Sequence, residues 1–170
     1  MKKSLIILLI FLAGVANIVN AQQLKFGHVD IQQLIQVMPE TATARTTLDK
    51  TQKELEDMLG TMQTELQTMY KDFTEKSDSM SDLVRKAKYD DIQAKQQRIE
   101  TFRSQSEQQL QQKQQDLLNP IIEKADKAIA DVAKEQGLIY VFDTSTRVIL
   151  YKSPQSVDIL PLVKKKLGIE

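Results

Sequence analysis

A regular spacing of apolar residues runs through the middle of the sequence. Steps of 7, 4, 3, 4, 3 and 4 separate successive members of the set Leu48, Leu55, Leu59, Met62, Leu66, Met69 and Phe73. This heptad spacing is typical of helices that wind around one another. A thinner set follows, at Val84, Ile92, Ile99, Phe102, Leu110 and Leu117. The pattern predicts two long helices, each with one narrow apolar face.

A polar cluster, Ser77-Asp78-Ser79-Met80-Ser81-Asp82, lies between the two sets. Ser and Asp side chains compete with a helix for its backbone hydrogen bonds, so the cluster favours a break. Two helices of about 35 residues, each about 50 Å long, would then fold into an antiparallel hairpin with its tip near residues 77–82. The alternative is a single helix of about 95 residues in a parallel coiled coil. The thinner second set of apolar residues favours the hairpin.

The segments on either side of the helical region have compositions that are typical of strands. Residues 25–30 are a candidate strand, and a brief amphipathic stretch follows until Pro39 interrupts it. The segment "LIYVFDTSTRVILY", residues 138–151, is rich in β-branched and aromatic residues. It predicts a β-hairpin that turns at residues 144–146. Gly137 is placed to cap the end of the long helix before this hairpin.

One strand precedes the helical region and two follow it, which predicts an α+β fold with a long helical arm inserted into a small β-containing body. A last short helix is expected over residues 159–167, capped by Asp158. Strands that are apolar on both faces need cover on both faces. A small, cysteine-free body has too few residues to bury both faces. This favours an oligomer whose sheets close together at the base. The expected core of the oligomer consists of Phe26, Val29, Ile139, Val141, Val148 and Leu150.

The N-terminus has the pattern of a secretory signal peptide. A basic head precedes an apolar run over residues 5–16, and small residues around Ala21 suit cleavage before Gln22. The run is shorter than the roughly 20 residues that a membrane span needs, which disfavours an anchor. The expected units are a signal peptide at residues 1–21, an arm at 41–119, and a body at 22–40 and 120–170.

The balance of charges and the scarcity of catalytic or metal-binding residues exclude several classes of protein. The chain has 23 basic and 23 acidic residues, and removal of Lys2 and Lys3 leaves two more acidic than basic residues. A nucleic-acid binder needs a basic face, so this balance argues against that class. His28 is the only histidine and cysteine is absent, so we expect a structural imidazole, no metal, no cofactor and no enzymatic activity.

Three segments carry a resemblance to a known family: "KFGHVDIQQLIQVMPE", "DLLNPIIEKADKAIADVAKEQGLIYVFD", and "VILY" before "SVDIL". In their order they resemble the Skp/OmpH-like periplasmic chaperones, over essentially the whole mature chain. The resemblance implies a homotrimer whose strands form a shared β-barrel. It also implies helical arms around a cavity that holds unfolded outer-membrane proteins in the periplasm. The near-neutral charge departs from basic members of the family, so no lipid or lipopolysaccharide site is carried over.

The second half of the arm is rich in glutamine, and between Gln105 and Asp116 the only apolar residue is Leu110. A polar wall with a thin apolar seam stays soluble when empty, and weak contacts on several arms add up to useful avidity. Methionines suit varied partners because their side chains are flexible. The alternative is a solvated coiled-coil face in which Met62 and Met69 pack the two helices together. The expected client-binding residues are Met62, Met69, Tyr70, Phe73, Met80, Val84, Tyr89, Ile92, Ile99 and Phe102.

The sequence and the resemblance together predict an ATP-independent periplasmic holdase that binds unfolded outer-membrane β-barrel proteins and prevents their aggregation. The alternative function is a structural coiled-coil spacer or tether of the cell envelope. A rigid spacer needs a dense, uninterrupted apolar seam, so the break at residues 77–82 favours the chaperone. Peripheral contact with a membrane or lipopolysaccharide has only weak support in the sequence.

Overall fold

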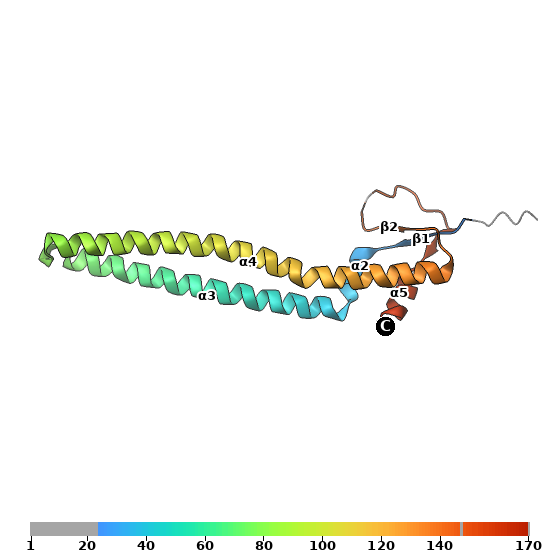
Figure 1. Cartoon of the computed structure of the whole chain (residues 1–170), viewed down its shortest axis with the longest axis horizontal. Coiled ribbons are helices and arrows are strands. Elements are labelled where there is room, and N and C mark those ends of the chain that lie inside the picture. Colours follow the sequence, from blue (N-terminus) through green and yellow to red (C-terminus); the bar gives the residue numbers. More distant parts are fainter. Residues whose placement is uncertain (1–23, 147, 170) are drawn as a thin grey trace, which may run out of the picture.

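The computed structural model describes residues 24–146 and 148–169, and it places a small body at one end of a long helical arm (Figure 1). The elements are β1 (Phe26–Val29), α2 (Ile31–Val37), α3 (Pro39–Lys76), η1 (Ser77–Ser79), α4 (Asp82–Gln136), β2 (Tyr140–Asp143), β3 (Val157–Asp158) and α5 (Leu160–Lys166). The expected signal peptide lies outside the described residues. Among the residues that are described, no helix combines the length and the hydropathy that a bilayer crossing requires.

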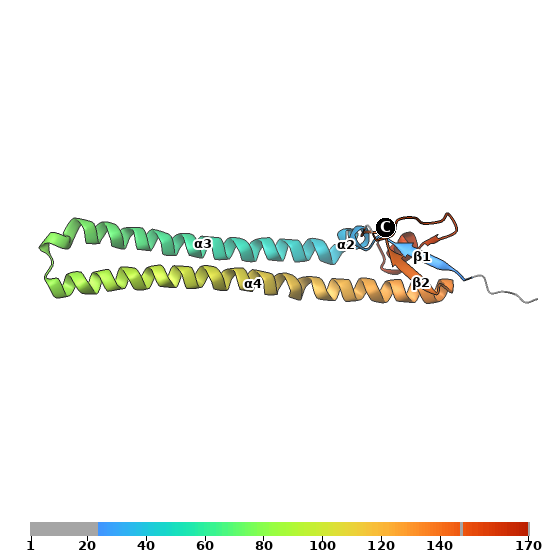
Figure 2. The same cartoon turned by 90° about the horizontal axis from the view of Figure 1, so that it is seen from above.

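The arm is an antiparallel helical hairpin, as the sequence predicts. α3 has 38 residues and α4 has 55, and the two run side by side along the arm in Figure 1 and Figure 2. The polar cluster forms the tip, where η1 follows α3 and Ser81 caps α4 by accepting a hydrogen bond from the Val84 N–H. The alternative of one continuous helix is wrong, because these Ser and Asp residues end one helix and begin the next.

Pro120 lies inside α4, and the helix continues past it to Gln136. Proline has no N–H, so one backbone hydrogen bond of the helix is missing at this position. The carbonyl that lacks a partner is that of Asp116, which is exposed, so water can reach it. α4 therefore extends from the arm into the body as one helix, and the body is built directly on the root of the arm.

The sheet has three parallel strands in the order β2-β1-β3. β1 pairs with β2 over its whole length and with β3 over two residues, Gly27 and His28. Parallel neighbours need a long crossover connection, and the whole arm forms that connection between β1 and β2. The candidate strand at residues 25–30 is therefore confirmed, with β1 at its centre.

The predicted β-hairpin over residues 138–151 is wrong. Its first half forms β2, whereas residues 148–151 pair with no described strand. The Asp143 carboxylate ends β2 by accepting hydrogen bonds from the Ser145 N–H (2.8 Å) and the Ser145 hydroxyl (2.7 Å). Within this turn the Thr144 N–H donates to the Val29 carbonyl of β1 (2.9 Å), so the turn itself stays beside β1.

The predicted helix ends are confirmed at Gly137 and near Asp158. Gly137 caps α4 with a φ of 64°, and its N–H donates to the carbonyls of Ala133 and Lys134. α5 covers Leu160–Lys166, and the Asp158 carboxylate accepts a hydrogen bond from the Leu160 N–H (3.0 Å). The helix α5, near the end of the chain, lies against the part of α4 that belongs to the body.

The core of the body lies between one face of the sheet and the helices α2, α4 and α5. Gly27 lies on this covered face, where an added Cβ would come within 2.6 Å of the Leu138 side chain. An added Cβ would displace the end of the Leu138 side chain, so glycine lets the sheet approach its neighbours closely. The buried cluster consists of Val29, Leu34, Met38, Ala44, Ile121, Ala125, Ala128, Val132, Ile159 and Val163.

Two glycine substitutions in the arm helices are expected to change stability in opposite directions. Gly137→Ala should lower the free energy of unfolding by about 1 kcal/mol, because a Cβ disfavours the left-handed conformation at φ 64°. Gly60→Ala should raise it by up to about 1 kcal/mol, because alanine has the higher helix propensity and no atom lies within 4 Å of the added Cβ. Urea unfolding followed by circular dichroism measures both, and the same sign for both would contradict this account.

Candidate functional site

The arm holds its two helices together through a narrow seam. The seven heptad residues of α3, Leu48 to Phe73, are all half-buried, and most residues between them are exposed. None of the seven is fully buried, because a two-helix arm covers only one side of each helix. The predicted heptad seam is therefore present, and it packs α3 against α4 with half-buried side chains.

The part of the arm nearest the tip is the better packed. Ile92 and Ile99 of α4 are buried, with 1% and 7% of their surface exposed. Polar contacts join the helices beside them: the Gln96 amide donates to the Tyr70 hydroxyl (2.7 Å), and the Lys95 ammonium pairs with a carboxylate of α3. This end of the hairpin therefore combines apolar burial with side-chain hydrogen bonds across the seam.

The middle of α4, in the half of the arm next to the body, is loosely packed. No residue of α4 from 100 to 120 is fully buried, and the inward positions Ser106 and Lys113 are polar. The Ser106 hydroxyl is buried without a hydrogen-bond partner in the described structure. The glutamines between 105 and 115 are all exposed. About 30 Å of helix, at 1.5 Å per residue, is therefore held by a few half-buried side chains.

The expected client-binding residues divide into three groups by burial. Two of them, Ile92 and Ile99, are buried in the seam and present little surface to a partner. The half-buried members are Met62, Met69, Phe73, Met80 and Phe102. The exposed members are Tyr70, Val84 and Tyr89. The exposed surface that these ten residues offer is concentrated in the half of the arm near the tip.

One exposed apolar residue of the arm, Leu83, was not expected as a binding residue. Leu83 has 80% of its surface exposed, and Met58, one of the methionines expected to suit varied partners, has 55% exposed. Leu83 lies off the heptad positions, so a search along the seam passes over it. An apolar residue outside the seam of a two-helix arm has no partner helix to cover it, and that is the signal that would have found Leu83.

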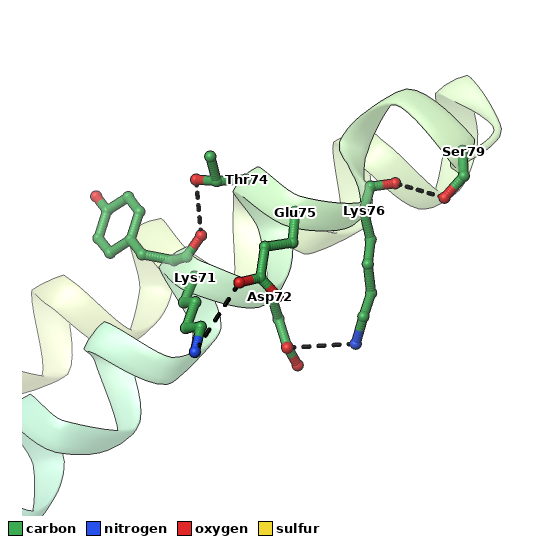
Figure 3. Close-up of polar contacts among 7 residues, drawn as sticks. Lys71, Asp72, Thr74, Glu75, Lys76 and Ser79 are labelled. Atoms are coloured by element: carbon green, nitrogen blue, oxygen red, sulfur yellow. Dashed lines mark hydrogen bonds and ion pairs between the residues drawn. The ribbon is translucent and has the colours of Figure 1, made fainter.

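Ionic contacts near the tip neutralise charges within the arm (Figure 3). The Lys76 ammonium pairs with the Asp72 carboxylate (3.2 Å), and Lys71 lies 3.9 Å from Glu75. The Ser79 hydroxyl donates to the Lys76 carbonyl (2.8 Å), which holds η1 against the end of α3. Exposed pairs of this kind stabilise little, and they leave the tip with charges of both signs.

At the root of the arm, an ion pair joins the two helices where they enter the body. The Lys124 ammonium of α4 donates to the Glu40 carboxylate at the start of α3. This hydrogen bond lowers the pKa of Glu40 below its ordinary value. Glu40 also lies in the first turn of α3, where a negative charge suits the helix dipole. The root therefore has a defined geometry, in contrast to the middle of α4.

The sheet face opposite the helices is open and aromatic. Phe26 of β1 stacks on Tyr140 and on Phe142 of β2, with ring centroids 6.4 and 6.2 Å apart. A cavity of about 790 Å³ lies over this face and is walled on its other side by residues 149–157. Exposed apolar residues continue along the adjoining loop, where Leu150 has 95% of its surface exposed.

The expected oligomer core divides between the two faces of the sheet. Val29 and Val141 belong to the covered face, and Val29 has only 1% of its surface exposed within the single chain. Phe26, Ile139, Val148 and Leu150 are exposed. In a single chain, the surface left for a partner is therefore the open face of the sheet and the loop beyond β2.

His28 faces this open side and is buried, with 7% of its surface exposed. Its ring lies between Ser156 and Lys152, at 2.8 and 2.9 Å. Within residues 24–146 and 148–169, no group of three or more His, Cys, Asp or Glu side chains is arranged to hold a metal ion. The described structure thus gives the imidazole two polar neighbours that both come from the loop before β3.

A small parallel sheet on the root of a long helical hairpin defines an elongated α+β protein. The family model described as outer membrane protein (OmpH-like) matches residues 25–167. The chain therefore belongs to the OmpH-like family, and the resemblance found in the sequence is confirmed.

A crystal structure of similar fold supports the same architecture. It is that of a proposed outer membrane chaperone (OmpH-like) from Caulobacter crescentus CB15, with a TM-score of 0.75 and 14% sequence identity. The similarity covers 85% of this chain and 83% of that one. No protein of curated function matches the sequence at a significant level.

Proposed function

We propose that this chain is an ATP-independent holdase chaperone of the periplasm. In this proposal it binds unfolded outer-membrane β-barrel proteins between its helical arms and prevents their aggregation. The supporting observations are the membership of an OmpH-like family and the surface of the arm, where isolated apolar side chains lie among exposed polar ones. The predicted signal pattern of residues 1–21 supports the compartment.

The observation that carries the proposal is the exposed, discontinuous apolar surface near the tip. Leu83, Val84 and Tyr89 expose 80%, 45% and 53% of their surface, and the charged residues between 85 and 88 separate the neighbours Leu83 and Val84 from Tyr89. A continuous apolar face would associate with copies of itself or retain its client. Separated apolar groups give weak contacts that add up when several arms hold one client. That combination suits binding of many unfolded sequences followed by release.

In the proposed assembly, three copies of the chain associate through their bodies to form a homotrimer. The open sheet face and the exposed side chains of Val148 and Leu150 are apolar surfaces that a single chain leaves uncovered. Covering them with neighbouring copies removes this area from water, at roughly 25 cal/mol per Å². The number three rests on the resemblance to the Skp/OmpH-like chaperones, and the described surface supports only the need for a partner.

Loose packing predicts that the arm bends in the half next to the body. Amides of α4 between residues 103 and 117 should exchange hydrogen at least about tenfold faster than amides between residues 121 and 132, because few buried side chains hold the middle of the helix. Hydrogen exchange followed by mass spectrometry measures both segments in one sample. Equal protection of the two segments would contradict a flexible arm, and a client that slows only the first segment would support binding there.

Aggregation suppression tests the function directly. A urea-unfolded outer-membrane barrel protein is diluted into buffer with the purified mature chain, and light scattering is followed against chain concentration. Suppression that saturates near three chains per client is expected for a trimeric holdase. Unchanged scattering in the presence of a folded, oligomeric chain would instead favour the structural spacer.

Two matched variants test whether the arm is responsible for the suppression of aggregation. The double variant Val84→Gln/Tyr89→Gln removes exposed apolar surface near the tip and should weaken suppression by about threefold or more. Leu162→Gln removes an exposed apolar side chain from α5 in the body and should leave suppression unchanged. Equal loss in both variants would place the client elsewhere than on the arm.

A further inference from the structure

Sulfur in this chain is concentrated in the arm. The sequence has six methionines and no cysteine, so thioethers are its only sulfur groups. Met1 lies outside the described residues, and Met38 is buried in the core of the body with 1% of its surface exposed. The others are Met58, Met62, Met69 and Met80. None of these arm methionines is fully buried, so oxidants dissolved in water can reach them.

Met69 and Met80 line one small cavity at the tip of the arm. The cavity has a volume of about 180 Å³, and its other lining residues are Asp72, Phe73, Lys76, Lys88 and Ile92. Met69 belongs to the heptad seam of α3, and Met80 follows η1. Ile92 comes from α4 and has 1% of its surface exposed, less than any other residue of the arm. Two half-buried thioethers therefore share a cavity with the most buried residue of the arm.

Small molecules can reach this cavity. Figure 1 places the tip at the end of the arm away from the body, so association of copies through their bodies leaves the tip uncovered. A water molecule occupies about 30 Å³ of the liquid, and hydrogen peroxide is only slightly larger. A cavity of about 180 Å³ therefore admits a peroxide beside the two sulfur atoms.

Oxidation makes both side chains polar. The thioether sulfur takes up one oxygen atom from hydrogen peroxide and gives up two electrons, and the peroxide is reduced to water. The sulfoxide oxygen accepts hydrogen bonds, and burial of such a group without a donor is costly. Of the side-chain donors that line the cavity, the Lys76 ammonium is already paired with the Asp72 carboxylate (3.2 Å), and Lys88 is exposed. A sulfoxide at either position is therefore better solvated outside the seam than within it.

We propose that Met69 and Met80 form an oxidant-sensitive site that opens the tip of the arm. As thioethers, they cover Ile92 and hold the end of α3 against α4. As sulfoxides, they turn toward water, which uncovers Ile92 and separates the two helices at this end. Methionine sulfoxide reductases return sulfoxides to thioethers, so the opening is reversible.

Opening of this site enlarges the apolar surface near the tip. Ile92 then joins Leu83, Val84 and Tyr89, which are exposed in the closed arm. A gain in client affinity is expected to follow, and this consequence alone rests on the proposed holdase function. The oxidation and the opening themselves are independent of that function.

Two double variants separate the closed state from the open state. Met69→Leu/Met80→Leu keeps the apolar volume and removes the sulfur, so it should stay closed in peroxide. Met69→Gln/Met80→Gln places a polar group of similar length at both positions and should be open without peroxide. Met58→Leu is the matched control, because Met58 is 55% exposed and lies outside the cavity. It should respond to peroxide as the wild type does.

Hydrogen exchange of the oxidised, oligomeric mature chain tests the opening. Each protein is treated with hydrogen peroxide, the peroxide is removed with catalase, and peptide mass spectrometry locates the added oxygen. Amides between residues 88 and 96 should exchange about tenfold faster or more in the oxidised wild type, the factor expected when the apolar burial of one methionine is lost. Reduction by methionine sulfoxide reductases should restore slow exchange.

The proposal is overturned if Met69 and Met80 take up no more oxygen than the buried Met38, or if they take it up and exchange of residues 88–96 does not change. Equal acceleration in oxidised Met69→Leu/Met80→Leu would assign the effect to other methionines and would overturn it as well. Aggregation suppression by the same samples then tests client affinity, and half suppression should need about threefold less of the oxidised chain. If no sample suppresses aggregation, the holdase function fails, while the exchange result still decides the oxidation site.

Discussion

Replacing Ala125 with aspartate is expected to unfold the body of the protein. Ala125 has no exposed surface and lies in α4 within the cluster that joins the sheet to α2 and α5. A carboxylate there has no room and no partner, and burial of an uncompensated charge is among the most destabilising changes known. The free energy of unfolding should fall by about 4 kcal/mol or more, which is a large part of the stability of a small domain.

Ala130→Asp is the matched control for this change. Ala130 lies five residues further along the same helix and is exposed, so the new carboxylate stays in water. Its effect should remain within about 0.5 kcal/mol. Urea unfolding of both variants, followed by circular dichroism, gives the comparison. Similar losses in the two variants would mean that helix propensity rather than core burial controls the result.

The arm could be predicted from the sequence because its determinants are local. Heptad spacing specifies which face of each helix turns inward, and a cluster of Ser and Asp residues specifies where the chain folds back. Both signals lie within a few residues of the structure that they produce. The break at η1, the cap at Ser81 and the half-buried seam of α3 all follow from these patterns.

The sheet could be predicted only in part, because strand pairing depends on distant residues. The apolar alternation of residues 138–151 identifies strand-like segments but does not identify their partners. β2 pairs with β1, more than a hundred residues earlier, once the arm has brought the two together. Asp143 then ends β2 through its bonds to Ser145, and the expected second strand is left without a partner. The short strand β3, Val157–Asp158, gave no signal of its own.

Burial on the arm was the least predictable part of the candidate site. Spacing alone gives the same pattern for a residue that packs between the helices and for one that meets a client. The structure separates them: Ile92 is buried, whereas Val84 at the tip is 45% exposed although both belong to the second apolar set. Position along the hairpin makes the difference, because Val84 lies in the first turn of α4, beyond the reach of the α3 seam.

Replacing Leu150 with glutamate is expected to abolish assembly of the proposed trimer. Leu150 has 95% of its surface exposed in the single chain, beside the open face of the sheet. Burial of a leucine side chain at an interface stabilises by about 2 kcal/mol. A carboxylate in its place must be desolvated without a partner, at a further cost of several kcal/mol. A symmetric trimer contains three copies of the change, so the equilibrium should shift almost entirely to single chains.

Analytical ultracentrifugation and aggregation suppression together give the outcome of Leu150→Glu. The mass in solution should fall to that of one chain, and suppression should fall with it because one arm cannot surround a client. The helical circular dichroism should be unchanged, since Leu150 contributes nothing to the buried cluster of the body. Thr146→Glu introduces the same charge at an exposed polar position four residues earlier and should assemble normally. A Leu150→Glu protein that remains oligomeric would place the interface on a different surface, and the open sheet face around Phe26 would be the next to test.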